Sequence, residues 1–415
     1  MSPPQSSVLG PQSSRAAWRR NFYVIWLATF ASVFGSHLAM PFIPLFIQRD
    51  LGVSDPGAAA AWAGLVNACA GFSMAIMAPI WGVLADRHGR KAMLVRAQFA
   101  LALSNAAASF VLAPWQLVGV RGLQGGFSGL ATAARALAAS TVPRERLPYA
   151  MGLIQSAAFM GQTLGPTVGG IVGGALGFRT AFFTTGCINT AAGVLTAMYV
   201  REGVVPASMP EEHTTASGLK SVLASAPLAT LVGILFLSSV ASSSIRPVLA
   251  LLLGEMDSSG EVVQTAGLAF GALGVAGAAA SLAASRVAGE GGLGRLLIVA
   301  GVGGAASNLL IGTASAPWMV VALLLGVGSC QGLLVSSATS LVSLHAPPDR
   351  QGTAFGVTAS VQALAQGVGP LVGGLVASAY SLRGAFGTAG SILVIAALVG
   401  MALRGIRTAT VGERL

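Results

Sequence analysis

The chain has 415 residues, of which 54% are hydrophobic and 9% are charged, and its mean hydropathy is +0.76. Soluble domains carry about 25% charged residues, so this composition excludes an ordinary soluble protein and indicates a membrane protein. The formal net charge of +10 could suggest a nucleic-acid partner, but its distribution along the chain, described below, indicates membrane topology instead.

A membrane-spanning helix needs about 20 mostly apolar residues. Twelve such stretches are predicted, at 22–47, 59–81, 92–113, 116–139, 149–174, 180–200, 222–252, 264–288, 294–314, 317–342, 352–378 and 383–404. Most connections between them are short. The polar, Ser- and Pro-rich residues 1–20 are expected to be disordered, residues 201–221 to form a linker, and residues 405–415 to form a tail.

The segments Pro143–Gly186 and Pro347–Gly390 carry nearly the same sequence. Gly165-Pro166 matches Gly369-Pro370 at a spacing of 204 residues, about half the chain length. Such a repeat indicates two homologous halves. We therefore expect an all-α membrane protein with twelve transmembrane helices in two pseudo-symmetric six-helix bundles, 21–200 and 222–404, with a substrate pathway between them.

The basic residues separate by side of the membrane. If the N-terminus is cytoplasmic, 18 of the 23 Lys and Arg residues lie on the cytoplasmic side, and Arg49, Arg179 and Arg383 lie on the outer side. Arg121 and Arg246 remain inside predicted spans. By the positive-inside rule, both termini and the linker are predicted to be cytoplasmic.

The loop after the second predicted span reads Gly82-Val-Leu-Ala-Asp86-Arg87-His88-Gly89-Arg90-Lys91. Asp86 can be stabilised near the positive end of a helix, and Gly89 permits a tight turn. Arg87 and Arg90 can bridge to carboxylates or to helix C-termini. A generic basic loop would not need this placement of Gly and Asp.

The fourth and fifth predicted spans carry the other two motifs. Arg121 lies inside span 4, followed by Gln124-Gly125, and a charge inside a membrane span faces a cavity or a partner by default. The alternative is that Arg121 extends towards the membrane surface. Span 5 contains glycines at close helical spacing around a proline, which form a groove for a neighbouring helix: Gly161, Gly165, Pro166, Gly169 and Gly170.

These motifs resemble the signatures of the major facilitator superfamily. The loop is similar to that family's G-x-L-A-D-R-x-G-R-K signature, span 4 to its R-x-x-Q-G motif, and span 5 to G-x-x-x-G-P-x-x-G-G. The last two resemble the twelve-helix drug–proton antiporter branch, and with Met40-Pro41 and Pro44 of span 1 the chain looks like the MdtG-like multidrug efflux group. The resemblance implies a conformational latch at the loop, proton coupling at Arg121, and export from a bacterial plasma membrane.

No Asp or Glu lies inside any predicted span, so the proton carrier is not evident; His37 and Asp50 are candidates beside Arg121. Arg246, which precedes Pro247 in a serine-rich part of span 7, suggests the central pathway. The remaining candidates for a mostly apolar substrate cavity with a few polar groups are Phe34, Gln124, Phe127, Gln155, Phe159, Gln162, Gln331, Gln362 and Gln366.

The predicted function is export of lipophilic or cationic compounds in exchange for protons, by a monomer in the lipid bilayer. The alternatives are a specific metabolite or sugar exporter and, in a different class, a non-transporting membrane receptor or scaffold. No cofactor, metal site, nucleic-acid partner or enzymatic activity is expected, because nucleotide-binding, nucleophile and metal-ligand motifs are not found.

Overall fold

A computed structural model describes residues 11–143, 146–200, 225–256, 260–284, 286, 290–346 and 351–412. All regular secondary structure in these residues is helical. The first half contains α1 (Pro11–Ala39), the short 3-10 helix η1 (Met40–Phe42), α2 (Ile43–Arg49), α3 (Pro56–His88), α4 (Arg90–Ala108), α5 (Pro114–Gly126), α6 (Leu130–Thr141), α7 (Leu147–Leu176) and α8 (Phe178–Tyr199). The second contains α10 (Ala226–Ser244), α11 (Arg246–Met256), α12 (Val262–Ala284), α13 (Glu290–Ile311), α14 (Pro317–His345), α15 (Gln351–Ala379) and α16 (Leu382–Gly412).

Nine helices of the described part are long and apolar enough to cross a membrane by length and composition: Trp18–Arg49, Pro56–Met77, Phe178–Tyr199, Ala226–Met256, Val262–Ala284, Gly292–Ile311, Pro317–His345, Ala354–Ala379 and Leu382–Met401. The helices α4, α5 with α6, and α7 occupy the other three predicted spans without meeting that criterion. The count of twelve spans therefore stays a prediction.

Two helix positions differ from the expectation at the chain ends. α1 begins at Pro11, within the segment 1–20 that was expected to be disordered, and α16 continues to Gly412 rather than ending at 404. Proline suits the first turn of a helix because its missing N–H would be unpaired there, which accounts for the start of α1. Residues 1–10 and the predicted linker 201–221 lie outside the described residues.

Three predicted spans are interrupted. Pro41 and Pro44 accompany the change from α1 through η1 to α2, because proline cannot donate the backbone hydrogen bond that a continuous helix needs. The break from α5 to α6 runs through Phe127 to Gly129, where Gly129 has φ of +115°. The break between α10 and α11 at Ile245 falls beside Arg246-Pro247.

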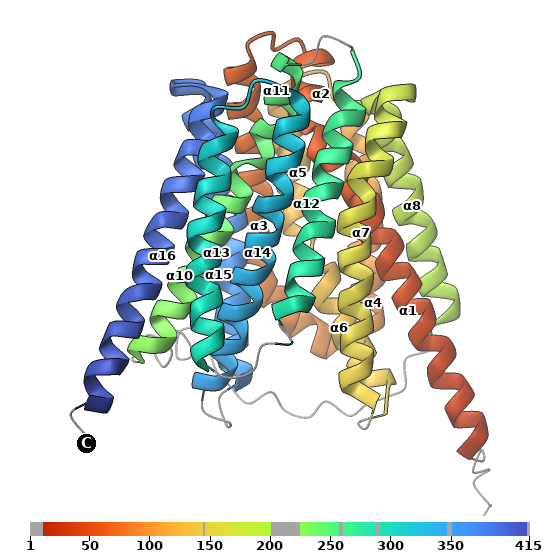
Figure 1. The fold of residues 1–415 in the computed structure, drawn as a ribbon. Helices are drawn as coiled ribbons and strands as arrows, with labels where there is room; N and C mark the ends of the chain where they lie inside the picture. Colours follow the sequence, from red (N-terminus) through yellow and green to blue (C-terminus); the bar gives the residue numbers. More distant parts are fainter. Residues whose placement is uncertain are drawn as a thin grey trace, which may run out of the picture.

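The helices of the two halves meet along α3 with α15 and along α7 with α12 (Figure 1). Glycines permit these close approaches: a Cβ atom at Gly64 would overlap the carbonyl of Pro370, and one at Gly267 would lie 2.8 Å from the carbonyl oxygen of Pro166. Thr167 also donates to the carbonyl oxygen of Gly267 at 3.5 Å.

All these contacts fall at one end of the bundle, which we call the closed end. They use the first half of α3 and of α12 and the second half of α7 and of α15, and α2 and α11 touch at the same end. Towards the opposite end, where α1 begins and α16 ends, the helices splay apart (Figure 1).

Candidate functional site

A cavity of about 270 Å³ lies between the two halves, next to the closed end. The first half contributes α1, η1, α2, α7 and one residue of α3, and the second half contributes α10, α11, α12 and α14. The wall consists of His37, Met40, Pro41, Pro44, Asn67, Phe159, Gln162, Thr163, Pro166, Ser242, Ile245, Arg246, Phe270, Leu273, Gly274, Gly277, Ala278, Ser281, Gly328, Gln331, Gly332 and Val335.

His37 lies in the last turn of α1, where the helix is about to break. Its Nδ1 atom is 2.9 Å from the carbonyl oxygen of Val33. Since a carbonyl oxygen only accepts, this bond places the hydrogen on Nδ1 and leaves Nε2 able to take up a proton.

Arg246 is the first residue of α11 and lines the cavity from the second half. Among the described residues it forms no ion pair with an acidic side chain. Close by, Ser242 donates a 2.6 Å hydrogen bond to Oε1 of Gln331, which joins α10 to α14 across the wall. Asparagine, glutamine, serine and threonine supply the other polar groups, and no Asp or Glu is part of the wall.

Four of the residues that were predicted to line a cavity are part of this wall: Phe159, Gln162, Arg246 and Gln331. His37, a predicted candidate for proton coupling, lies in the same wall. Phe34, Gln124, Phe127, Gln155, Gln362 and Gln366 are not part of its wall. Phe34 instead stacks on Phe30 at 5.8 Å between ring centroids. The ring of Phe127 lies 5.8 Å from that of Trp81, at the break between α5 and α6.

Arg121 does not line this cavity but lies inside the first half, with 4% of its surface exposed. Nη1 donates to Oε1 of Gln124 at 2.7 Å, and the guanidinium group lies 5.7 Å from the ring of Phe182 on α8. Nε and Nη2 are buried without a hydrogen-bond partner. The charge of Arg121 is therefore buried, and its side chain does not extend towards the membrane surface.

Asp50 lies at the end of α2, outside the spans, and its carboxylate is 3.8 Å from Nε of Arg179. Burial raises the pKa of this carboxyl group, while the nearby charges of Arg179 and Arg49 partly offset that rise. Asp50 is also separate from the cavity wall.

The glycine motif of α7 lies in two interfaces. Gly161, Gly165 and Gly169 face α1, and a Cβ atom at Gly169 would overlap the carbonyl of Leu38. Gly170 faces α12, where its Cβ would lie 2.8 Å from the carbonyl oxygen of Val263. The motif thus packs α7 against its own half and against the other half at once, and Pro166 contributes to the cavity wall between them.

The predicted latch lies between α3 and α4. Gly89 has φ of +91°, which favours glycine and allows α4 to begin directly at Arg90. Nη1 of Arg90 donates to the carbonyl oxygen of Ala136 on α6 at 3.2 Å. The side chains of Asp86 and Arg87, like the surroundings of Gly82, lie outside the described parts of the structure.

Several wall residues were not identified from the sequence, among them Asn67, Thr163, Ser242 and Phe270. Each lies on a helix whose lipid-facing and inward-facing sides are both apolar, so hydrophobic periodicity does not reveal the inward face. The small residues Gly267, Gly271 and Gly274 of α12 are the available signal, because their spacing marks the face that packs against α7.

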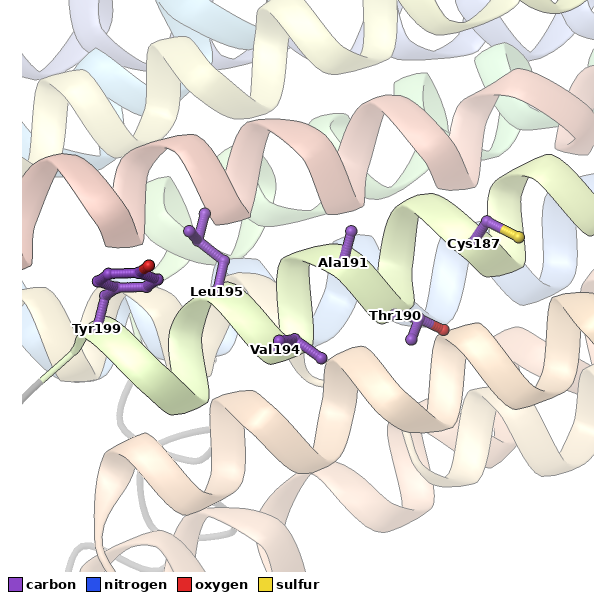
Figure 2. A pocket seen from close by; sticks show the side chains of 6 residues that line it. All are labelled: Cys187, Thr190, Ala191, Val194, Leu195 and Tyr199. Atoms are coloured by element: carbon purple, nitrogen blue, oxygen red, sulfur yellow. The ribbon is translucent and has the colours of Figure 1, made fainter.

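A second, shallow hollow of about 470 Å³ lies along α8 alone. Figure 2 shows its six residues following one side of that helix: Cys187, Thr190, Ala191, Val194, Leu195 and Tyr199. Most of them are exposed and apolar. In a helix of a membrane protein such a stripe suits contact with lipid tails, and it is far less suited to a polar substrate than the central cavity.

Comparison with known proteins identifies the fold and the family. The family model described as Major Facilitator Superfamily matches residues 25–369 and 231–413. The chain is 31% identical to the multidrug resistance protein MdtG of Salmonella typhimurium (strain LT2) over 393 residues, which is 93% of this chain and 96% of that protein. MdtG of Salmonella paratyphi C is 32% identical over the same length.

Solved structures support the same assignment of the fold. A bacterial homologue of the human lysosomal transporter Spinster, in an inward-facing and unoccupied conformation, has a TM-score of 0.77 at 13% identity and covers 94% of this chain and 97% of its own. The human organic anion transporter MFSD10 has a TM-score of 0.65 at 19% identity, covering 92% and 99%. The chain is a multi-pass membrane protein with the fold of these transporters, and it belongs to the major facilitator superfamily.

Proposed function

We propose that this protein exports small lipophilic compounds in exchange for protons, by alternating access of the central cavity to the two sides of the membrane. The observation that carries the proposal is the position of the cavity between two halves whose close glycine contacts, in the described residues, lie between the middle of the helices and the closed end. A rocking motion that separates α3 from α15 and α7 from α12 would expose the same cavity at that end.

The multidrug function is supported by the relatives named multidrug resistance protein, which align with nearly the whole chain. The apolar part of the wall, including Phe159, Phe270 and Met40, is the kind of surface that accommodates a lipophilic compound. The protein works as a monomer in a bacterial plasma membrane. Apolar stripes such as that on α8 contact the surrounding lipid.

The orientation follows from the distribution of basic residues. With both termini and the 201–221 segment in the cytoplasm, the closed end faces outwards and the structure is inward-facing. The two bundles 21–200 and 222–404 are the moving units. Asp86, Arg87 and Arg90 form the latch at the cytoplasmic end, for which the bond from Arg90 to Ala136 on α6 gives partial support.

Proton coupling in this proposal involves His37, because Nε2 of its ring is available at the cavity wall. Arg121, which is buried inside the first half, contributes a fixed positive charge to proton coupling in this proposal. Asp50 is paired with Arg179 away from the cavity. In this proposal it supports proton coupling from the outer surface.

Everted membrane vesicles with an imposed pH gradient test the function. A panel of dyes and antibiotics should accumulate in vesicles that contain the protein, and His37→Ala should shift the pH dependence of that uptake. Vesicles with His345→Ala, in which a histidine outside the cavity wall is changed, are the matched control. Uptake that is insensitive to collapse of the pH gradient would exclude proton antiport.

A further inference from the structure

We propose that the central cavity selects lipophilic anions, with the guanidinium group of Arg246 as the partner of a carboxylate or sulfonate on the substrate. This inference rests on the proposed function in one respect, since it takes the same cavity as the substrate site. It adds the sign of the charge that the cavity accepts.

The permanent charge in the wall is positive and belongs to Arg246. His37, the other basic residue of the wall, can be neutral, and no lining residue is acidic. The structure describes the side chains of four acidic residues, and none of them is part of the cavity wall: Asp50, Asp55, Glu255 and Glu261. A positive charge facing a small cavity with a largely apolar wall is weakly screened, so it repels a cation and attracts an anion.

Arg246 has the geometry for an oxyanion. It begins α11 directly after the break at Ile245, so its side chain leaves the backbone beside the cavity. It makes no ion pair with an acidic residue in the described part of the chain, which leaves its donors for a ligand. A guanidinium group presents parallel N–H donors that match a carboxylate or sulfonate, whereas an ammonium group acts as a point charge.

The rest of the wall suits an amphiphilic ligand. The amide groups of Asn67 and Gln162 and the hydroxyl of Thr163 can both donate and accept hydrogen bonds, so they accept an anion as readily as a neutral group. Apolar side chains supply the surface for the body of the ligand: Met40, Phe159, Phe270, Leu273 and Val335.

The sign of the substrate has an energetic consequence. An anion that leaves while a proton enters moves positive charge inwards in every cycle, so the membrane potential drives its export as well as the pH gradient. A monovalent cation exchanged for one proton moves no net charge. Sensitivity to the potential therefore distinguishes the two kinds of substrate.

Equilibrium binding to the purified full-length protein tests the charge preference. Fluorescein, an anion, and rhodamine 123, a cation, share the xanthene framework and are similar in size. Fluorescence anisotropy at one fixed pH, with protein-free detergent as the blank, should give at least tenfold tighter binding of fluorescein. Equal affinity, or tighter binding of rhodamine 123, would overturn the inference without any mutation.

Variants then assign the preference to the residue. Arg246→Gln should weaken fluorescein binding at least tenfold, and Arg246→Lys should retain part of the affinity. Arg20→Gln removes one positive charge at an exposed position of α1 and should change nothing. Thermal unfolding checks that each variant is folded. If a folded Arg246→Gln protein binds fluorescein as the wild type does, Arg246 is not the partner and the inference fails.

Transport of the two dyes separates this inference from the proposed function. If rhodamine 123 alone is taken up by everted vesicles under a pH gradient, the function stands and the anion preference is wrong. If fluorescein binds as expected while neither dye nor any compound of the wider panel is moved by the gradient, the proposed function fails and the preference stands. If fluorescein is taken up, a potassium–valinomycin potential, positive inside the vesicles, should accelerate its uptake.

Discussion

Arg121 donates a hydrogen bond of 2.7 Å to Gln124, one helical turn further along α5, and both side chains are buried inside the first half. This bond is the one described hydrogen bond of a guanidinium group that also has two buried unpaired nitrogens, Nε and Nη2. A buried charge so sparsely satisfied is costly to the fold, which indicates that the arginine is kept for a reason other than stability.

Removal of the acceptor should therefore be more harmful than removal of the charge. Gln124→Leu leaves the whole guanidinium group without a hydrogen bond, and we expect it to lower the free energy of unfolding by about 1–3 kcal/mol. Arg121→Met, a residue of similar length without charge, should leave stability unchanged or higher. Thermal or denaturant unfolding of the purified proteins measures both.

Transport by the same two variants distinguishes the roles of the charge. We expect Arg121→Met to abolish gradient-driven efflux even though the protein is stable, because the buried positive charge that we propose to take part in proton coupling is gone. Normal efflux by a stable Arg121→Met protein would mean that Arg121 is a structural residue, and it would remove Arg121 from proton coupling.

The contact between α7 and α1 depends on the absence of a side chain at Gly169. An alanine Cβ there would overlap the carbonyl of Leu38, so Gly169→Ala should destabilise the protein by about 1–3 kcal/mol and reduce transport. Gly152→Ala, in the same helix with nothing within 4 Å of the added atom, is the matched control and should be neutral or slightly stabilising. Melting temperatures that fall equally for the two variants would contradict this account.

The repeat predicts which positions correspond, but not which of them line the cavity. Arg179 and Arg383 both lie in the first turn of the last helix of their half and donate to the backbone carbonyls of Ser109 and Gly312, at 2.8 and 3.0 Å. Their equivalence could be read from the sequence. The acceptors could not, because a backbone carbonyl is present at every residue and leaves no sequence signal.

Gln162 and Gln366 show the limit of the symmetry argument. They are equivalent in sequence, yet only Gln162 lines the cavity. Next to Gln366, Gly367 packs against Gly71 of α3, whereas Thr163, next to Gln162, faces Gly274 of α12. The rotation of each helix about its axis decides such differences, and in a membrane both faces of a helix are apolar, so residue patterns determine that rotation poorly.

The pKa of Asp50 predicts a pH dependence of stability. Its carboxyl group has a pKa above its ordinary value because it is partly buried, so the folded protein binds this proton more tightly than the unfolded chain. Stability should then fall as the pH rises from about 4 through the raised pKa. Asp50→Asn should remove that part of the dependence. A wild-type profile that parallels the Asp50→Asn profile from pH 4 to pH 7 would contradict it.

The orientation in the membrane is testable by cysteine labelling. Tyr380 is 85% exposed between α15 and α16 at the closed end, and Arg20 is exposed near the start of α1 at the opposite end. In intact cells a membrane-impermeant maleimide should label Tyr380→Cys but not Arg20→Cys, after Cys69, Cys187 and Cys330 are replaced by alanine. The reverse pattern would place the termini outside and invert the proposed direction of transport.

The break between α5 and α6 is stabilised by two side chains from neighbouring helices. Nε1 of Trp81 donates to the carbonyl oxygen of Gly126 at 2.6 Å, and Nη2 of Arg96 donates to that of Ser128 at 3.1 Å. The Arg96 guanidinium carbon also lies 3.4 Å from the centre of the Trp81 ring. These groups satisfy the carbonyls that an interrupted helix leaves unpaired in an apolar environment.

Trp81→Phe keeps an aromatic ring for Arg96 but loses the donor to Gly126, so it should lower the free energy of unfolding by about 1 kcal/mol. Arg96→Leu removes both the stacking and the bond to Ser128, and it should cost more. Trp115→Phe makes the same change as Trp81→Phe at a position that is 66% exposed, and it should have almost no effect. Because the break lies between the Arg121 motif and the α6 end that Arg90 contacts, we also expect Trp81→Phe to slow transport at matched expression. Equal stability of the Trp81→Phe and Trp115→Phe proteins would show that the break does not depend on this hydrogen bond.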